Sequence, residues 1–343
     1  MFLEPTVKYF SQVTVSEYFE ITKTKFPFLH SLLDRERFSS ENIKQIFSAM
    51  KIIDFEGDTK GGRGRDYFLA QNKYPLNRSI GFQSIFNLIG PAADGDKTVL
   101  DILGGNGTLY RAAKLLNYDH LKIIINDISE EMIENAFKQN IPCIRQPAQD
   151  LLFKNACLDA VIFAYGTHHI PIKDRLKAFE ETKRVLQPGG TIVFHDYEHD
   201  SMTSKWYSEV LHEFTYTGHD FIHFYKDQLR SDLLTAGFAD VEVFYSYDPF
   251  VIEAETAEAA KEDLLDHLIS LFGLKKFREA YGYDRALFFA EAEKLVRKYA
   301  DFRECEDEEI NAVIRVKELT TYPYEGKFRC EMPRYSLMAS GKA

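Results

Sequence analysis

The stretch VLDILGGNGT at residues 99–108 constrains the fold more than any other part of this chain. An apolar run passes the acidic residue Asp101, continues through a glycine-rich turn and enters a helix-like segment near Thr108. Glycine lets the backbone bend tightly and approach a ligand closely. The helix that follows offers unpaired amide groups at its N-terminus. The stretch therefore predicts a strand, a ligand-binding turn and a helix.

A second apolar run, at residues 121–125, ends at Asn126 and Asp127. A carboxylate at the tip of the second strand of such a unit is placed to bind ribose hydroxyls. Strand-like and helix-like segments then continue to alternate, with strand ends expected near Ile144, Tyr165 and His195. This alternation is typical of an α/β fold with a parallel sheet. Together these features predict a nucleoside-type cofactor over the carboxyl ends of the strands.

Over roughly residues 80–245 the chain resembles the class I, Rossmann-like S-adenosylmethionine-dependent methyltransferases. Residues 98–107 are similar to the family's first motif, residues 126–132 to its ribose-binding segment and residues 148–153 to its adenine-binding turn. Residues 158–169 resemble its fourth strand and active-site loop, and residues 184–193 its turn into the fifth strand. A lone glycine-rich turn would be weak evidence, but here the pieces occur in order. The resemblance implies a seven-stranded, mostly parallel sheet with helices on both faces, and S-adenosylmethionine as cofactor.

The resemblance also implies a set of cofactor-binding residues. These are Asp101, Leu103, Gly104, Gly105, Asn106, Gly107, Asp127, Ile128, Ala148, Gln149, Asp150 and Tyr165. The sequence departs from the family pattern at two positions. Leu103 replaces the first glycine of the motif, so its side chain is expected to crowd the methionine portion of the cofactor. Pro147 replaces an acidic residue, so backbone groups with Gln149 or Asp150 are expected to hold the adenine.

Composition restricts the substrate and the compartment. The net charge of -11 argues against nucleic acid, since phosphate binding needs basic surface. No apolar run is long enough to predict a membrane span, and the N-terminus lacks the pattern of a secretion signal. Four scattered cysteines favour free thiols in a reducing cytoplasm. Aromatic residues make up 14% of the chain and could line an apolar pocket for a small molecule, as in secondary metabolism.

The chain divides into a helical N-terminal segment at 1–90, a cofactor-binding core at 91–250, a helical insertion or cap at 251–330 and a last core strand at 331–343. The rival position for the last strand is 249–253. The N-terminal segment contains a capped amphipathic helix at 39–47, with a further apolar position at Met50, and a polar loop at 58–65. We expect this segment to cover the pocket, to form a homodimer, or both. The loop is either a lid that orders on binding or an ordinary surface loop.

Three residues are candidates for catalysis. Tyr165 ends the fourth strand, where an aromatic ring could attract the sulfonium cation. His169 follows in the active-site loop, and His195 lies at the tip of the fifth strand, which is expected to point it into the crevice. Either histidine could act as general base because histidine titrates near neutrality. The run at 195–200 contains two histidines and two aspartates that could hold a metal, but a capped polar loop explains it equally well, and no metal site is predicted.

The predicted reaction is in-line methyl transfer to a small organic molecule with release of S-adenosylhomocysteine. Three alternatives remain open. The cofactor's own amino group could close an azetidine ring and release methylthioadenosine, as azetidine-forming enzymes of similar fold do. The chain could bind the cofactor without catalysis. A nicotinamide oxidoreductase would share the ribose-binding logic, although the motifs after the later strands disfavour it.

Overall fold

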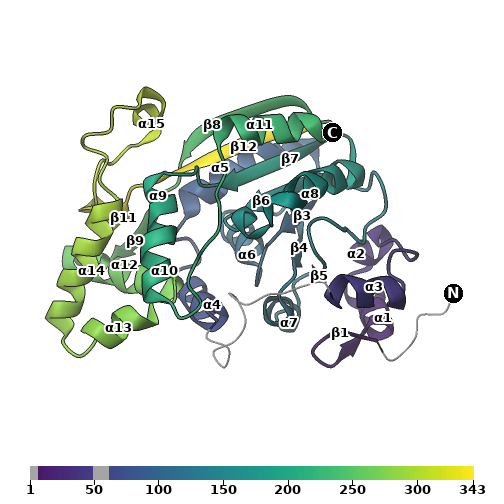
Figure 1. Ribbon diagram of the computed structural model, residues 1–343, viewed down its shortest axis with the longest axis horizontal. Helices are drawn as coiled ribbons and strands as arrows, with labels where there is room; N and C mark the ends of the chain where they lie inside the picture. The colour runs from purple at the N-terminus through teal and green to yellow at the C-terminus, as the bar shows by residue number, and fades with distance from the viewer. Residues whose placement is uncertain (1–6, 49–61) are drawn as a thin grey trace.

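A seven-stranded sheet forms the centre of the protein in the computed structural model, which describes residues 7–48 and 62–343 (Figure 1). The strand order is β5-β4-β3-β6-β7-β12-β8. The strands are β3 (Lys97–Ile102), β4 (Leu121–Asp127), β5 (Cys143–Arg145), β6 (Leu158–Ala164), β7 (Leu186–Asp196), β8 (Ala239–Tyr247) and β12 (Tyr335–Lys342). Strand β12 runs antiparallel to both neighbours, and the other strands run parallel to one another. The predicted Rossmann-like, mostly parallel sheet is confirmed.

Helices cover both faces of this sheet (Figure 1). Those of the core are α5 (Ser79–Ile89), α6 (Thr108–Leu115), α7 (Glu130–Lys138), α8 (Ile172–Val185) and α11 (Lys226–Thr235), with short 3₁₀ turns η2 (Ala92–Asp94) and η3 (Thr167–His169). Helix α5 packs against α6, and α8 packs against α11. Within the described ranges, no helix combines the length and apolarity needed to cross a lipid bilayer.

The structure decides between the two positions for the last core strand. Strand β12 is buried along nearly its whole length, as a strand with neighbours on both sides and helices above and below must be. The rival segment is β9 (Phe250–Ala254), whose Glu253 is exposed and accepts hydrogen bonds from Arg329 at 2.5 and 3.0 Å. An exposed polar residue at that position is typical of a sheet at the surface. Strand β9 indeed belongs to a separate three-stranded sheet with β10 (Thr320–Tyr324) and β11 (Lys327–Met332).

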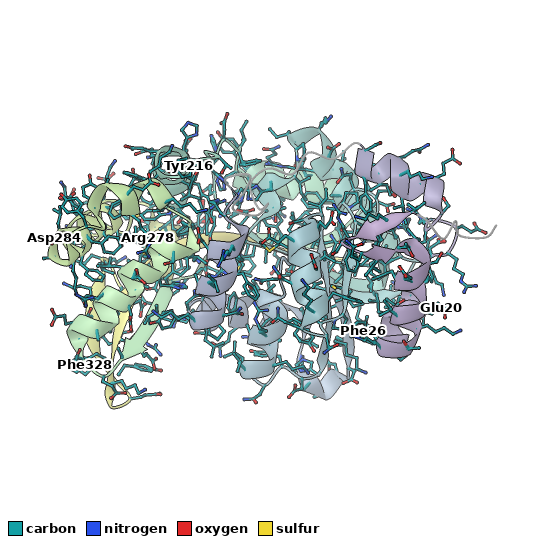
Figure 2. All side chains as sticks on the ribbon, turned by 90° about the horizontal axis from the view of Figure 1, so that it is seen from below. Glu20, Phe26, Tyr216, Arg278, Asp284 and Phe328 are labelled. Carbon is teal, nitrogen blue, oxygen red and sulfur yellow. The ribbon has the colours of Figure 1, made fainter. Side chains whose placement is uncertain are left out.

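The sequence predicted a helical segment at 251–330, but in the structure this segment also contains strands. Its helices are α12 (Ala257–Leu271), α13 (Lys275–Tyr281), α14 (Arg285–Tyr299) and α15 (Glu308–Val313). Helices α12, α13 and α14 share a second hydrophobic core with the three-stranded sheet and with η4 (Trp206–Leu211, π-helical) and α10 (His212–Phe214), which follow α9 (Met202–Lys205). Helix α15 instead packs in a smaller cluster with Tyr247 and Tyr335. The β10–β11 hairpin was missed, although the alternating polar and apolar residues at 327–332 and the turn at Glu325 and Gly326 are hairpin signals. Figure 2 shows Asp284 and Phe328 of this part at the opposite end of the molecule from Glu20 and Phe26.

The N-terminal segment contains a short hairpin besides its helices. Its elements are β1 (Lys8–Phe10), β2 (Val13–Thr14), α1 (Val15–Lys25), α2 (Pro27–Leu32), α3 (Ser40–Ser48) and α4 (Gly64–Lys73). The buried hydroxyls of Tyr9 and Tyr18 donate to the carbonyls of Arg145 and Cys143, each at 2.7 Å, which fixes the segment to the β5 edge of the sheet. The predicted helix at 39–47 is α3. Met50 and positions 58–61 of the expected loop lie outside the described residues, and α4 begins within the rest of that loop.

Candidate active site

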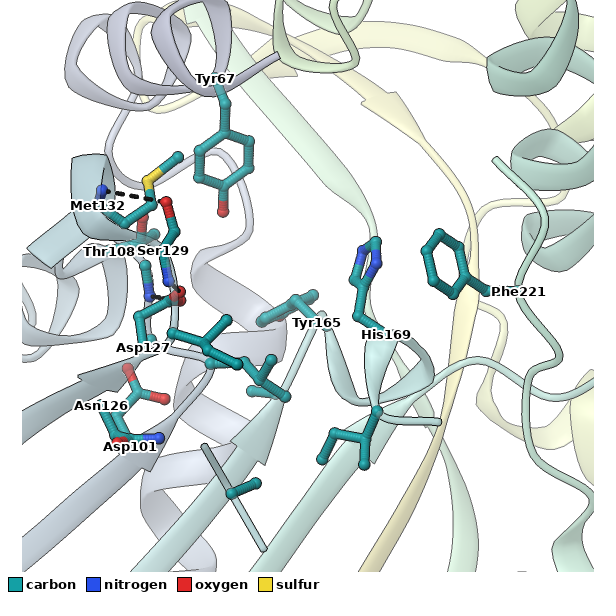
Figure 3. Close-up of a pocket in the computed structure, with 18 of the residues that line it drawn as sticks. Tyr67, Asp101, Thr108, Asn126, Asp127, Ser129, Met132, Tyr165, His169 and Phe221 are labelled. Carbon is teal, nitrogen blue, oxygen red and sulfur yellow. Dashed lines mark hydrogen bonds between the residues drawn. The ribbon is translucent and has the colours of Figure 1, made fainter. Parts of the chain in front are cut away.

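A cavity of about 550 Å³ lies over the carboxyl ends of β3, β4 and β6 (Figure 3). Parallel pairing brings these ends together, because Ile102 lies opposite Asn126 on one side and opposite Phe163 on the other. The core sheet forms the floor of the cavity, while the N-terminal segment and the 217–221 loop form parts of its walls. This is the position predicted for the cofactor.

The glycine-rich turn is shaped by a carboxylate below it. A Cβ on Gly104 would lie 2.6 Å from Asp101 Oδ2, so only glycine fits there. Gly105 has a φ of 57° and donates its N–H to Asp127 Oδ2 at 2.9 Å. Leu103 lines the cavity and also has a left-handed φ of 61°, which costs a non-glycine residue about 1–2 kcal/mol. The turn is therefore held close to the tips of β3 and β4.

Two predicted cofactor residues of the turn do not line the cavity. Asn106 is buried, and its Oδ1 accepts from Arg111 Nη2 at 3.0 Å. Gly107 is the N-cap of α6 with a φ of 91°, and a Cβ there would lie 2.9 Å from Ile141 Cδ1. Both residues build the loop behind the cavity, which corrects the expectation that they contact the cofactor.

Asp127 lies at the tip of β4 and faces the cavity (Figure 3). Its Oδ1 accepts the Ser129 N–H at 2.8 Å, and its Oδ2 accepts the Gly105 N–H. Burial raises the pKa of Asp127 to about 6, although these N–H groups oppose the shift. Each carboxylate oxygen keeps a second lone pair, so the group remains able to accept hydrogen bonds from a diol.

Asp101 is fully buried at the floor of the cavity. Among the described residues, neither of its carboxylate oxygens has a hydrogen-bond partner. Burial and the nearby Asp127 raise the pKa of Asp101 well above its ordinary value. Asn126, whose Oδ1 also lacks a partner within the described chain, lies beside it. Buried groups without partners are costly, so this corner of the cavity fits a ligand with a cationic or hydrogen-bond-donating group, such as the amino group of S-adenosylmethionine.

The predicted adenine-binding turn contributes part of the wall. Ile128, Ala148 and Gln149 line the cavity together with Pro147. Asp150 does not line it, and its carboxylate lies 3.4 Å from the Arg37 guanidinium outside the cavity. Of the two side chains proposed for the adenine, only Gln149 is therefore in position.

Tyr165 follows β6 and packs against both the core of the sheet and the second core. Its φ is 61°, and its hydroxyl donates to Asp248 Oδ1 at 3.0 Å. Burial and Asp248 raise the pKa of Tyr165 well above its ordinary value. Strained backbone of this kind clusters at functional sites. Tyr165 lines the cavity as a neutral phenol whose hydroxyl is directed away to Asp248.

The structure does not bring His195 to the cavity. This side chain is fully buried behind Tyr165, with ring centroids 4.1 Å apart, and its Nε2 lies 3.4 Å from Asp248 Oδ2. The expectation that the tip of β7 points it into the crevice is wrong, because Tyr165 and the loop before β9 cover it. Burial would raise the pKa of Asp248, but Arg334 and His195 overcome this effect and hold it below its ordinary value.

His169 does line the cavity, opposite the strand-tip carboxylates and beside Phe221 (Figure 3). Behind it, His168 packs against His219 and His223. Burial and neighbouring His168 lower the pKa of His219 far below its ordinary value and that of His223 to about 4. His169 is therefore the predicted catalytic histidine that can contact a substrate.

Sequence reasoning missed several cavity residues. Arg63 and Tyr67 come from the start of α4, Arg78 precedes α5, and Phe221 and Phe272 come from distant segments. The Arg78 guanidinium carbon lies 4.1 Å from the centre of the Tyr165 ring. The glycine- and arginine-rich composition at 61–65 was the only sequence feature that pointed to Arg63. The other residues come from separate segments, and no local pattern predicts which remote side chains meet.

The sheet order, the glycine-rich turn and the strand-tip carboxylates define a class I, Rossmann-like methyltransferase fold. Residues 99–190 match the family model described as a methyltransferase domain. This part of the chain is thus a methyltransferase domain, similar to class I S-adenosylmethionine-dependent methyltransferases.

Named relatives share only part of this chain. It is 33% identical over 111 residues to the ubiquinone/menaquinone biosynthesis C-methyltransferase of Rickettsia prowazekii (strain Madrid E), covering 29% of this chain and 43% of that enzyme. The enzyme of the same name from Hahella chejuensis is 30% identical over 108 residues, with the same coverage. The chain thus spans less than half the length of these relatives.

Solved structures with similar chains include a S-adenosylmethionine-dependent methyltransferase from Archaeoglobus fulgidus, with a TM-score of 0.44, 16% identity and coverage of 81% of this chain and 99% of that one. Another is the Haemonchus contortus phosphoethanolamine N-methyltransferase 2 in complex with S-adenosyl-L-methionine, with a TM-score of 0.43, 18% identity and coverage of 93% and 60%.

Proposed function

We propose that this protein transfers a methyl group from S-adenosylmethionine to a small organic molecule and releases S-adenosylhomocysteine. One observation carries the proposal: two carboxylates on adjacent strand tips, Asp101 and Asp127, flank a glycine turn and face one cavity. Asp127 has lone pairs for two ribose hydroxyls, and Asp101 has oxygens without partners in the described chain for an amino group. S-adenosylmethionine, when bound, supplies a methyl group on a positively charged sulfur.

The chain's own residues would position the reactants and exclude water. Methyl transfer needs an in-line nucleophile about 3–3.5 Å from the methyl carbon. Tyr165 presents a neutral ring, which attracts a cation without neutralising it as a carboxylate would. Strong anionic contact to the sulfur would instead stabilise the charge that transfer removes. His169, which lines the opposite wall, would contact the acceptor and take its proton.

The far end of the cavity favours an acceptor that is flat and anionic. Arg63 and Arg78 bring positive charge to a wall otherwise made of aromatic rings, including Tyr207 and Phe272. Arg78 is 4% exposed, and its Nη2 donates to Tyr67 Oη at 3.4 Å. Guanidinium groups pair well with carboxylate and phosphate. We therefore expect an aromatic or conjugated organic acid as the acceptor class.

The test is a mass-spectrometric readout of what the purified protein does to S-adenosylmethionine, with and without aromatic acids and cell extract. S-adenosylhomocysteine with a methylated acceptor supports the proposal. Methylthioadenosine without added acceptor would replace it by azetidine formation, in which the amino nitrogen bonds to the carbon next to sulfur and the carbon–sulfur bond breaks. Tight binding without turnover would indicate a non-catalytic protein.

His169→Ala provides the matched variant for the catalytic wall. We expect turnover to fall by about 10²–10⁴-fold, while affinity for S-adenosylmethionine stays unchanged because His169 lies opposite the carboxylates. The control is His120→Gln, whose ring contacts the Gly90 carbonyl away from the cavity. Unchanged turnover in His169→Ala would remove this histidine from the reaction.

A further inference from the structure

Three histidines cluster at one wall of the cavity: His169 lines the wall, and His168 and His219 lie behind it. His168, His169 and His219 each offer a ring nitrogen, and these nitrogens all lie within 4.8 Å of one another. The ring centroids are 4.4 Å apart for His168 and His169, 5.2 Å for His168 and His219, and 5.3 Å for His169 and His219. Three rings from the η3 turn and the 217–221 loop thus converge on one point.

The cluster contains buried ring nitrogens that nothing in the described chain satisfies. His168 Nε2 and both ring nitrogens of His219 have no hydrogen-bond partner among the described residues. His168 and His219 are 1% and 3% exposed, so water does not replace those partners at the surface. A buried polar atom without a partner carries a free-energy penalty of about 1–3 kcal/mol. A ligand at this point would remove the penalty.

A carboxylate orients the most buried member of the cluster. Asp196, fully buried at the end of β7, lies 2.9 Å and 3.0 Å from His168 Nδ1 through its two oxygens. It also accepts the backbone N–H of His168 and of Tyr197, each at 2.8 Å. This pairing places the proton on Nδ1 and leaves the Nε2 lone pair free. A histidine oriented in this way by a carboxylate is the usual second-sphere arrangement at metal sites.

We propose that His168 Nε2, His169 and His219 bind one divalent transition-metal ion, with Asp196 positioning His168 and the remaining coordination position open to the cavity. Neutral imidazole is the commonest protein ligand for zinc and related ions. A tetrahedral ion about 2.0–2.1 Å from three imidazole nitrogens places their ring centroids about 5 Å apart. The three separations given above require shifts of less than about 1 Å to reach this geometry.

A second set in the same region, His168, Asp196 and His223, suits an ion less well. All three of its members are buried away from the cavity, and Asp196 already accepts the bonds that orient His168. His169, by contrast, lines the cavity, as do Gly218 and Phe221 of the loop that carries His219. An ion at the proposed site would therefore meet an oxygen, nitrogen or sulfur donor of the bound acceptor.

Metal binding is tested without turnover, so its failure is distinct from failure of the proposed function. The purified full-length protein is treated with a chelator, desalted and titrated with Zn²⁺ or Co²⁺. We expect stoichiometric binding and the visible absorption of four-coordinate Co²⁺, with bands that change when azide is added. We expect Asp196→Asn to lower metal affinity by about 10–100-fold. His169→Ala and His219→Ala each remove a metal ligand and should lower the affinity further. His120→Gln is the control.

The outcomes separate the possible roles. Negligible Co²⁺ uptake, or equal affinity in the parent and in His169→Ala, overturns the metal site. His169 is half-buried, so this variant is expected to keep its fold, which circular dichroism checks. If the metal binds but azide leaves the spectrum unchanged, the open position is wrong. If chelation leaves methyl transfer intact, the ion is not needed for the reaction, and His169 takes the acceptor's proton only in the metal-free protein.

Discussion

Gly81→Ala is predicted to destabilise the protein, although alanine has a higher helix propensity than glycine. Gly81 lies inside α5, where alanine is favoured over glycine by about 1 kcal/mol. A Cβ at this position would nevertheless lie 2.0 Å from Asp248 Oδ1 and 2.6 Å from Tyr165 Oη. Carbon and oxygen cannot approach so closely, so the carboxylate or the helix must move.

The Asp248 carboxylate has little freedom to move. It is fully buried, Arg334 Nη2 donates to its Oδ2 at 2.6 Å, and Tyr165 donates to its Oδ1. Hydrogen bonds to a charged group contribute about 1.5–3 kcal/mol each, and overpacking a core costs about 1–3 kcal/mol. After the helical gain is subtracted, we expect a loss of about 3 kcal/mol. For a chain of this length, that loss lowers the midpoint of thermal unfolding by about 4 °C.

Urea and thermal unfolding followed by circular dichroism measure the effect. Gln83→Ala, on the exposed face of the same helix, is the matched control and is expected to change stability by less than about 0.5 kcal/mol. If Gly81→Ala is as stable as the parent, or more stable by the amount that helix propensity predicts, the contact between α5 and Asp248 does not have the geometry described.

Three further predictions concern the cavity. Asp127→Asn removes one acceptor at the ribose position and should weaken S-adenosylmethionine binding by about 10–100-fold in calorimetry. The control Asp119→Asn, at an exposed ion pair with Lys114, should leave the affinity unchanged. Equal affinities in the two variants would argue against Asp127 as the ribose ligand. Since burial raises the pKa of Asp127 to about 6, affinity should fall as pH drops from 7 to 5. The same protonation should stabilise the free protein over that range, because the folded state holds this proton more tightly than the unfolded state. Tyr165→Phe should reduce turnover by less than about tenfold, because a phenol with a raised pKa is not a base at neutral pH; a thousandfold loss would show that its hydroxyl takes part.

The sequence alone was enough to predict the glycine-rich turn and the strand-tip acid that line the cavity. The turn at 103–105 and the acid at Asp127 are set by short-range rules: an apolar run makes a strand, glycines permit the bend, and the carboxyl ends of parallel strands meet at one edge. These rules need no knowledge of distant residues. They also predicted a fifth strand ending near His195, but not that this side chain is covered.

The tertiary structure decided which residues face the cavity and which support it from behind. His195, Gly107 and Asp150 were plausible site residues in the sequence, yet contacts with other segments hold them away from the cavity, and Asn106 is held away by Arg111 of the following helix. Arg78, conversely, reaches the wall because α5 packs beneath β7 and places it over the Tyr165 ring. Propensity and periodicity describe neighbours along the chain. Which side chains are buried, and which face the cavity, depends largely on residues tens of positions apart, and for Asp150 and Arg37 more than a hundred, and only the packed fold brings those together.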